Sequence, residues 1–240
     1  MSPTRREFIG VSAAVLASRP ESVLRRTNVP KAAPVLLFQG DSITDCGRDR
    51  TVSAANDPRA LGTGYPLLLA AQLRDQHPDR DLQVFNRGVS GNTVDDLRAR
   101  WTHDTIDIKP AVLSILIGVN DKWHTLMGTY HGTADAYEAG YRSLIESTRA
   151  ALPDTRLVIM EPFVLRTGVV KDDWFPDFDR YRAAARHVAD GAKATFVPLH
   201  DMLQGLAHKA APAYWLVDGV HPTVAGHAAI ARQWMQKVKF

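Results

Sequence analysis

The chain has 240 residues, of which 45% are hydrophobic and 23% charged, and its formal net charge is +3. This length suits one large α/β domain and is too short for two ordinary domains joined by a linker. The excess positive charge lies in residues 1–30, which carry five Arg and two Glu, so that 24 basic and 24 acidic side chains remain in the rest of the chain. Composition therefore gives no reason to expect a nucleic-acid partner.

The first 30 residues have the layout of an export signal. Arg5 and Arg6 precede Phe8 and a short apolar run, residues 9–17. A basic region before a short apolar region is typical of secretory signals, and the paired arginines resemble a twin-arginine signal. The apolar run is too short for a transmembrane helix, which needs ~20 residues. We therefore expect a leader over residues 1–30 that exports a folded domain, residues 31–240. A basic tail on a cytoplasmic protein is the alternative.

Short apolar runs alternate with stretches of helical periodicity along the rest of the chain. Strands are expected at residues 35–38, 82–85, 111–117, 157–160 and 195–197, and helices at 65–76, 93–105, 134–151, 178–190 and 223–237. Alternation of strand and helix predicts a parallel sheet with helices on both faces. The expected fold is a three-layer α/β/α sandwich with a flavodoxin-like, five-stranded parallel sheet. The sequence leaves the oligomeric state open, including a homo-oligomer.

Polar blocks follow the predicted strands. They are residues 40–45 after the first strand, 86–92 after the second, 118–121 after the third, and 218–222 before the last helix. Ligands of such sheets bind outside the carboxyl ends of the strands. We therefore expect the four blocks to meet on one rim of the sheet and to form a site there.

The residues in these blocks are those that acyl transfer from an ester needs. Ser42 is the candidate nucleophile, His221 the candidate general base, and Asp218 the carboxylate that orients the histidine. The backbone N–H groups of Ser42 and Gly88 and the amide of Asn120 are the candidate donors to the oxyanion. Each residue alone is also compatible with an ordinary turn, cap or solvated side chain. Their order along one predicted rim favours catalysis.

Together the blocks resemble those of the SGNH hydrolases, also called GDSL esterases and lipases. The resemblance spans residues 34–240, and Ser42, Gly88, Asn120 and His221 stand at the family-naming positions. It implies a flavodoxin-like fold, a Ser-His-Asp mechanism without a metal or other cofactor, and an oxyanion hole of Ser42, Gly88 and Asn120. The α/β-hydrolase alternative requires Gly-x-Ser-x-Gly, and residues 88–91 are one residue too short for that motif.

Longer stretches resemble the branch of acetyl-xylan and related carbohydrate acetylesterases, namely residues 40–48, 87–93, 97–101, 118–123, 161–163 and 220–227. This resemblance implies a short acyl ester, such as acetyl, on xylan-derived or other carbohydrate. A broad short-chain esterase, a lysophospholipase or a thioesterase is the first alternative. A carbohydrate-binding protein that has lost the chemistry is the second.

Further side chains are candidates for substrate contacts because they fall on the predicted rim. These are Asp41, Arg48, Trp123, Phe163 and Trp215, to which Trp174 is a weaker addition. Aromatic rings can pack against sugar faces, although core packing is the alternative for each of them. Asp41, like Asp45, could instead hold the loop by accepting backbone N–H bonds, and Arg48 could brace the loop through a salt bridge. Asp41, Asp45 and His221 do not have the spacing of a metal site, so we expect none.

Overall fold

The computed structural model describes residue 1 and residues 33–239. The chain divides into two units, Met1–Ala32 and Ala33–Phe240, and the fold is that of the second unit. Apart from Met1, the expected leader lies outside the described residues, and its role stays a prediction.

A parallel sheet forms the middle layer of the described fold. Its strand order is β2-β1-β3-β4-β5, and in register Leu36 of β1 lies between Val84 of β2 and Val112 of β3. The strands are β1 (Val35–Gly40), β2 (Gln83–Asn86), β3 (Val112–Leu116), β4 (Arg156–Met160) and β5 (Thr195–Val197). This is the flavodoxin-like strand order, so the predicted fold class is confirmed. No strand begins or ends more than two residues from its predicted bound.

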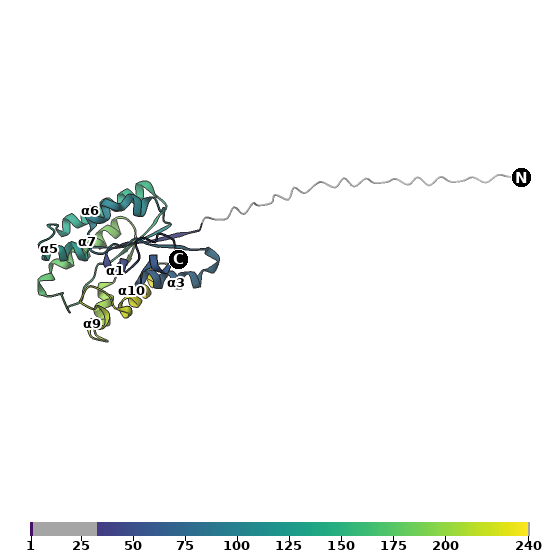
Figure 1. Ribbon diagram of the computed structural model, residues 1–240. Coiled ribbons are helices and arrows are strands. Elements are labelled where there is room, and N and C mark those ends of the chain that lie inside the picture. The colour runs from purple at the N-terminus through teal and green to yellow at the C-terminus, as the bar shows by residue number, and fades with distance from the viewer. Residues whose placement is uncertain (2–32, 240) are drawn as a thin grey trace. The chain divides into compact units, whose positions relative to one another are not determined.

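Helices cover both faces of the sheet because successive strand residues point to opposite sides. On β1, Leu36 and Phe38 pack in a core with helices α3 (Tyr65–Gln76) and α10 (Val224–Lys237). Leu37 packs in a second core, on the opposite face, with helices α4 (Val94–Trp101), α6 (Ala134–Ala151) and α7 (Asp177–Gly191). Figure 1 shows α6 and α7 on one side of the sheet and α3 and α10 on the other.

The long helices lie where the sequence predicts them, with one departure. Thr93 caps α4, and its side chain and that of Asp96 form a capping box. The helix expected over 93–105, however, ends as an α-helix at Trp101 and continues as a π-helical turn, η2 (Thr102–Ile106). In this turn the N–H of Asp107 donates to the carbonyl of Thr102, five residues back.

Several short helices were not predicted. Two of them matter for function, because α1 (Ser42–Asp45) begins directly after β1 and α5 (Val119–Leu126) begins directly after β3. The polar blocks expected to be rim loops are therefore partly first turns of helices. The others are α2 (Pro58–Leu61), η1 (Pro78–Arg80), η3 (Asp172–Trp174), α8 (His200–Ala207) and α9 (Pro212–Trp215).

Candidate active site

The rim of the sheet brings Ser42, His221 and Asp218 together. Ser42 starts α1, and its Oγ lies 2.9 Å from Nε2 of His221. Nδ1 of His221 lies 2.8 Å from Oδ2 of Asp218. A hydroxyl, an imidazole and a carboxylate in this order form the arrangement that activates a serine for attack on an acyl carbon.

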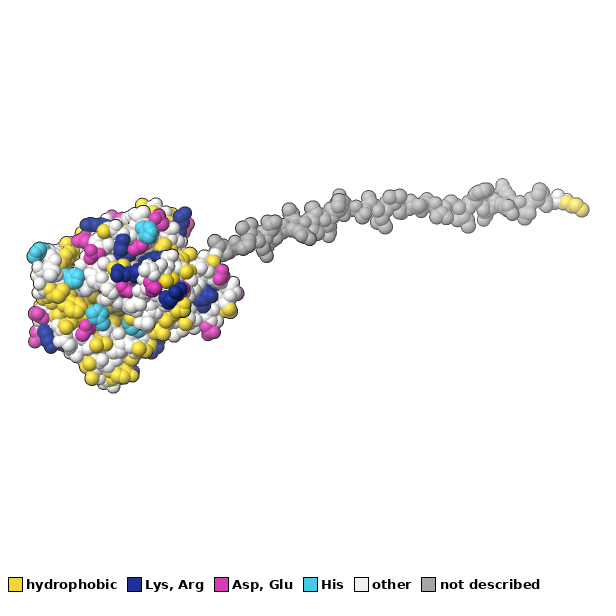
Figure 2. All heavy atoms as spheres, in the orientation of Figure 1, with side chains coloured by type: hydrophobic (Ala, Val, Ile, Leu, Met, Phe, Trp, Pro, Cys, Tyr) yellow, Lys and Arg dark blue, Asp and Glu magenta, His cyan; other side chains and the backbone are white. Residues whose placement is uncertain are grey.

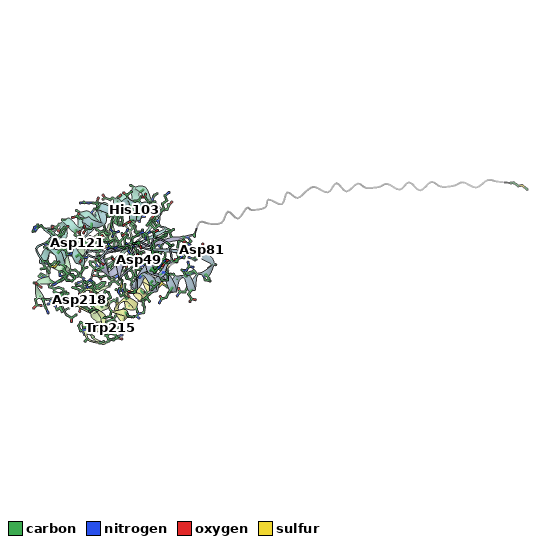
Figure 3. All side chains as sticks on the ribbon, in the orientation of Figure 1. Asp49, Asp81, His103, Asp121, Trp215 and Asp218 are labelled. Atoms are coloured by element: carbon green, nitrogen blue, oxygen red, sulfur yellow. The ribbon has the colours of Figure 1, made fainter. Side chains whose placement is uncertain are left out.

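Asp218 is fixed by its own loop. Its Oδ1 accepts hydrogen bonds from the N–H groups of Val220, at 2.9 Å, and His221, at 2.8 Å. Burial by itself raises the pKa of Asp218, but these hydrogen bonds, the bond to the imidazole and the charge of His221 outweigh it, so the pKa lies below its ordinary value. The carboxylate therefore stays ionised and can hold His221 in one orientation. Figure 3 labels Asp218 close to Trp215 at the α9 end of the domain.

Asp41 and Asp45, two aspartates of the first polar block, hold in place the helix α1 that carries Ser42. Oδ1 of Asp41 accepts the N–H of Ile43 at 2.9 Å and so caps α1. Oδ2 of Asp45 accepts the N–H of Ser90 at 2.9 Å and its hydroxyl at 3.0 Å, which ties α1 to the loop after β2. Asp41 is only 1% exposed and was predicted as a substrate contact. Its carboxylate is instead packed beneath the helix that carries Ser42.

The burial of Asp41 has an electrostatic consequence. Loss of hydration raises the pKa of Asp41 to about 7, although the hydrogen bond from Ile43 and the charge of His221 oppose the shift. Its second oxygen has no hydrogen-bond partner among the described residues. A buried carboxyl of this kind stands one residue before the nucleophile.

Gly88 lies in a different environment from the one expected of an oxyanion donor. Its N–H donates to Oδ1 of Asn86 at 2.9 Å in a buried position. A Cβ on Gly88 would lie 2.4 Å from the backbone nitrogen of Asp45, so this glycine is needed for close packing against α1. The sequence expectation is corrected here, because the N–H group of Gly88 is already engaged and faces the interior.

Gly91, three residues later in the same block, has the free donor. It adopts φ +83°, its N–H has no acceptor within residues 33–239, and a Cβ built on it would meet open space. Gly91 is not among the oxyanion donors predicted from the sequence, although it is a second glycine in the same polar block as Gly88. Asn120, in the first turn of α5, is 4% exposed and its Nδ2 donates to the carbonyl of Asn92, next to Gly91, at 3.0 Å.

Comparison with known proteins assigns the family. The GDSL-like Lipase/Acylhydrolase family matches residues 38–229, a range that contains all four polar blocks. The chain belongs to this family. It is a carboxylic ester hydrolase, and the resemblance predicted from the sequence blocks is confirmed.

Individual relatives of this hydrolase agree with the assignment. It is 37% identical over 209 residues to an acetylxylan esterase of Geobacillus stearothermophilus, covering 85% of this chain and 94% of the relative. A GDSL-like lipase from Parabacteroides merdae superposes with a TM-score of 0.84 at 43% identity, covering 85% of this chain and 95% of that one. Axe2, an acetylxylan esterase of Geobacillus stearothermophilus, gives a TM-score of 0.78 at 36% identity, covering 86% and 94%. Solved catalytic mutants of Axe2 replace a serine, an aspartate or a histidine.

Arg48 and Trp123 lie near the site of the esterase. The Nε of Arg48 donates to the carbonyl of Gly88 at 2.7 Å, so this side chain braces the loop after β2. Burial, aided by repulsion from Arg87 and Arg100, lowers the pKa of Arg48 to about 10, although the charge of Asp45 opposes the shift. Trp123 lies in α5, half-buried, with its ring centroid 5.9 Å from that of His221. Trp123 is thus a wall of the site beside the general base.

The other aromatic candidates lie elsewhere. Phe163 is 0% exposed and Trp174 is 2% exposed, and both pack in the core on the α3 and α10 side. Their expected place on the rim is corrected, because both side chains are buried in this core, where the ring centroid of Trp174 lies 5.9 Å from that of Trp123. Trp215 ends α9, is half-buried, and its Nε1 donates to the carbonyl of Leu206 at 3.0 Å.

Apolar side chains gather around α9. Figure 2 shows hydrophobic atoms at the end of the domain where Figure 1 labels this helix. Tyr214, Val217 and Val224 are exposed there by 58%, 66% and 83%. Val217 precedes Asp218 directly, so this apolar surface adjoins the loop that carries Asp218 and His221.

In residues 33–239, no three His, Cys, Asp or Glu side chains are grouped as metal ligands would be.

Proposed function

We propose that this esterase hydrolyses acetyl esters of xylan-derived or other acetylated carbohydrates, with Ser42 as nucleophile, His221 as general base and Asp218 as the orienting carboxylate. The observation that carries the mechanism is the pair of contacts at 2.9 Å and 2.8 Å that join the three side chains in series. The substrate class is supported by the identity to acetylxylan esterase over most of both chains.

The reaction proceeds in two halves. Oγ of Ser42 attacks the ester carbonyl carbon while Nε2 of His221 takes the hydroxyl proton. Collapse of the tetrahedral intermediate breaks the bond to the sugar oxygen, which takes that proton from His221 and leaves as a hydroxyl. Water, deprotonated by His221, then attacks the acetyl-enzyme and releases acetate. Asp218 stabilises the imidazolium in both halves.

The oxyanion of each intermediate is stabilised by three proposed donors. These are the N–H groups of Ser42 and Gly91 and the amide of Asn120. Removal of one such donor costs about 10²–10³ in turnover in a related kind of site. Gly91 replaces Gly88 in this role because its N–H has no acceptor among the described residues, whereas the N–H of Gly88 is bonded to Asn86.

The substrate assignment is tested by a series of esters. We expect kcat/KM to be highest for acetyl esters, to fall as the acyl chain lengthens, and to be higher on acetylated xylo-oligosaccharides than on simple alkyl acetates. A preference for acyl chains of eight carbons or more would instead assign the protein to lysophospholipases or thioesterases. Ser42→Ala is the control in each assay, because it leaves the pocket in place and removes the nucleophile.

We also propose that the chain is exported through the basic and apolar segments of residues 1–30. Among the described residues, none of the helices is both long and apolar enough to cross a bilayer. Replacement of Arg5 and Arg6 by Lys should abolish export and leave the esterase in the cytoplasm. Unchanged secretion of this variant would contradict a twin-arginine route.

A further inference from the structure

Arg100 is the residue with the most connections beneath the candidate oxyanion hole. It lies in the last turn of α4, and its side chain is 19% exposed. Its guanidinium donates to acceptors from β1 and from both ends of the loop after β2. The acceptors are Oδ1 of Asn92 at 2.8 Å, the carbonyls of Arg87 at 2.8 Å and Gly40 at 3.2 Å, and Oε1 of Gln39 at 3.0 Å.

The charge of Arg100 is balanced locally. Asp104, in the π-helical turn η2, lies 2.8 Å from Nη1 of Arg100. Burial by itself raises the pKa of Asp104, but hydrogen bonds from His103 and Arg100 outweigh it, so the pKa lies below its ordinary value. Gln39 is 0% exposed and donates to the carbonyl of Asp104 at 2.8 Å, which leaves its own oxygen for Arg100. The guanidinium is thus held from several directions.

One of these contacts leads to the oxyanion donors. The side chain of Asn92 accepts from Arg100, while the carbonyl of Asn92 accepts from Nδ2 of Asn120 at 3.0 Å. That bond uses one amide hydrogen of Asn120 and leaves the other for substrate. Gly91 directly precedes Asn92, so a fixed Asn92 also fixes the direction of the Gly91 N–H.

The geometry points to Arg100 as a positioning residue of the oxyanion hole, acting through Asn92 on Gly91 and Asn120. This inference rests on the proposed oxyanion roles of those two residues. Arg100 itself faces the underside of the loop and has no part in acid–base chemistry. Lysine cannot replace it, because a single ammonium group lacks the planar fork that reaches acceptors on separate segments.

The test is a double-mutant cycle on p-nitrophenyl acetate hydrolysis. We expect Arg100→Gln and Asn92→Ala each to lower kcat by about 10–100-fold, which is less than the ~10²–10³-fold known for outright loss of one oxyanion donor, with KM changed less than about threefold. Arg100→Lys should rescue little of this loss. Combined with Asn92→Ala, Arg100→Gln should lower kcat by no more than about threefold beyond Asn92→Ala alone, because both substitutions break the same contact and coupled residues are not additive. The pH of half-maximal kcat should not move, because Arg100 contacts none of residues 218–221.

Arg98→Gln is the matched control, since Arg98 lies on the same helix, is 58% exposed and pairs only with Asp95 among the described residues. It should keep wild-type kcat. Losses in kcat that multiply in the double variants, or a rise in KM with kcat unchanged, would overturn the role of Arg100. If Arg100→Gln does not fold, Arg100→Lys takes its place in the cycle with Asn92→Ala. If Asn120→Ala keeps wild-type kcat, the proposed oxyanion hole falls, and the positioning role falls with it.

Discussion

The two sides of the catalytic rim differ in burial and in the state of their carboxyl groups. The serine side consists of α1, the loop 87–92 and the first turn of α5, where Asp41, Asn120 and Asp121 are 1%, 4% and 0% exposed. The histidine side is the loop between α9 and α10, where the side chains of Asp218 and His221 are 28% and 40% exposed. On the serine side burial raises carboxyl pKa values, whereas on the histidine side hydrogen bonds lower that of Asp218.

In the proposed mechanism, this difference separates two tasks. The serine side fixes the positions of the nucleophile and the oxyanion donors, which requires dense packing and buried hydrogen bonds. The histidine side moves a proton and must keep a charged partner, which requires contact with solvent and an ionised Asp218. Substitutions on the two sides should therefore fail in different ways.

The largest expected effect lies on the histidine side. Asp218→Asn should lower kcat by about 10⁴-fold, because the amide no longer stabilises the imidazolium and holds the wrong tautomer of His221. The free energy of unfolding should change little, since Asp218 is partly exposed and the amide oxygen of Asn can still accept from the N–H groups of Val220 and His221. Steady-state kinetics and urea denaturation of the same preparation measure both quantities. A loss of kcat below tenfold would remove Asp218 from the catalytic group.

A smaller effect is expected on the serine side, in stability rather than turnover. Burial, opposed by a hydrogen bond from the Val94 N–H and aided by the charge of Asp41, raises the pKa of Asp121 to about 7. An unfolded aspartate titrates near pH 3.9. The folded protein therefore binds more protons between these values, so the contribution of Asp121 is complete below about pH 4 and is lost as pH rises through about 7.

Asp121→Asn should flatten this dependence. Between pH 5 and pH 8, the free energy of unfolding of the wild type should fall by about 2 kcal/mol more than that of the variant. Asp135→Asn is the control, because its side chain is 87% exposed. Urea denaturation at unit intervals of pH gives the comparison. Equal slopes for wild type and Asp121→Asn would contradict the raised pKa.

The smallest expected effect is on substrate binding, at Trp123, whose ring lies between the serine side and the histidine side. Trp123 lies in α5 on the serine side, and its ring approaches that of His221. Trp123→Leu should raise KM for acetylated xylo-oligosaccharides by about threefold to tenfold, the size of one lost aromatic contact. The kcat for p-nitrophenyl acetate should change less than about twofold. An equal loss on both substrates would make Trp123 a support for His221 instead of a substrate contact.

Much of the fold could be predicted because its signals are local. The central strands β1, β3 and β4 are short apolar runs that are buried on both faces, and Thr93 with Asp96 marks the start of α4. The π-helical turn at Thr102–Ile106 had no such local signal, and its Asp104 carbonyl and Thr105 hydroxyl accept hydrogen bonds from Gln39, which is far away in the sequence. The short helix α5 was not predicted, because its first residues, 119–121, belong to a polar block that was interpreted as a loop of the site.

The candidate site was less completely predictable. The order of blocks brought Ser42, Asp218 and His221 to one rim, as the parallel sheet requires. Which glycine offers its N–H depends instead on packing, because Gly88 and Gly91 stand in the same block and only the contact with Asp45 separates their environments. Phe163 was misplaced for a similar reason, since the direction of the chain after β4 is set by the core and not by local sequence.

The most direct test of the central claim is detection of the acetyl-enzyme. Asp218→Asn protein, incubated with acetylated xylo-oligosaccharide and quenched in acid, should be analysed by peptide mass spectrometry. One acetyl group on Ser42 is the predicted result, and it should be absent from the Ser42→Ala protein. An acetyl group on another side chain, or ester turnover by Ser42→Ala at the wild-type rate, would contradict the account.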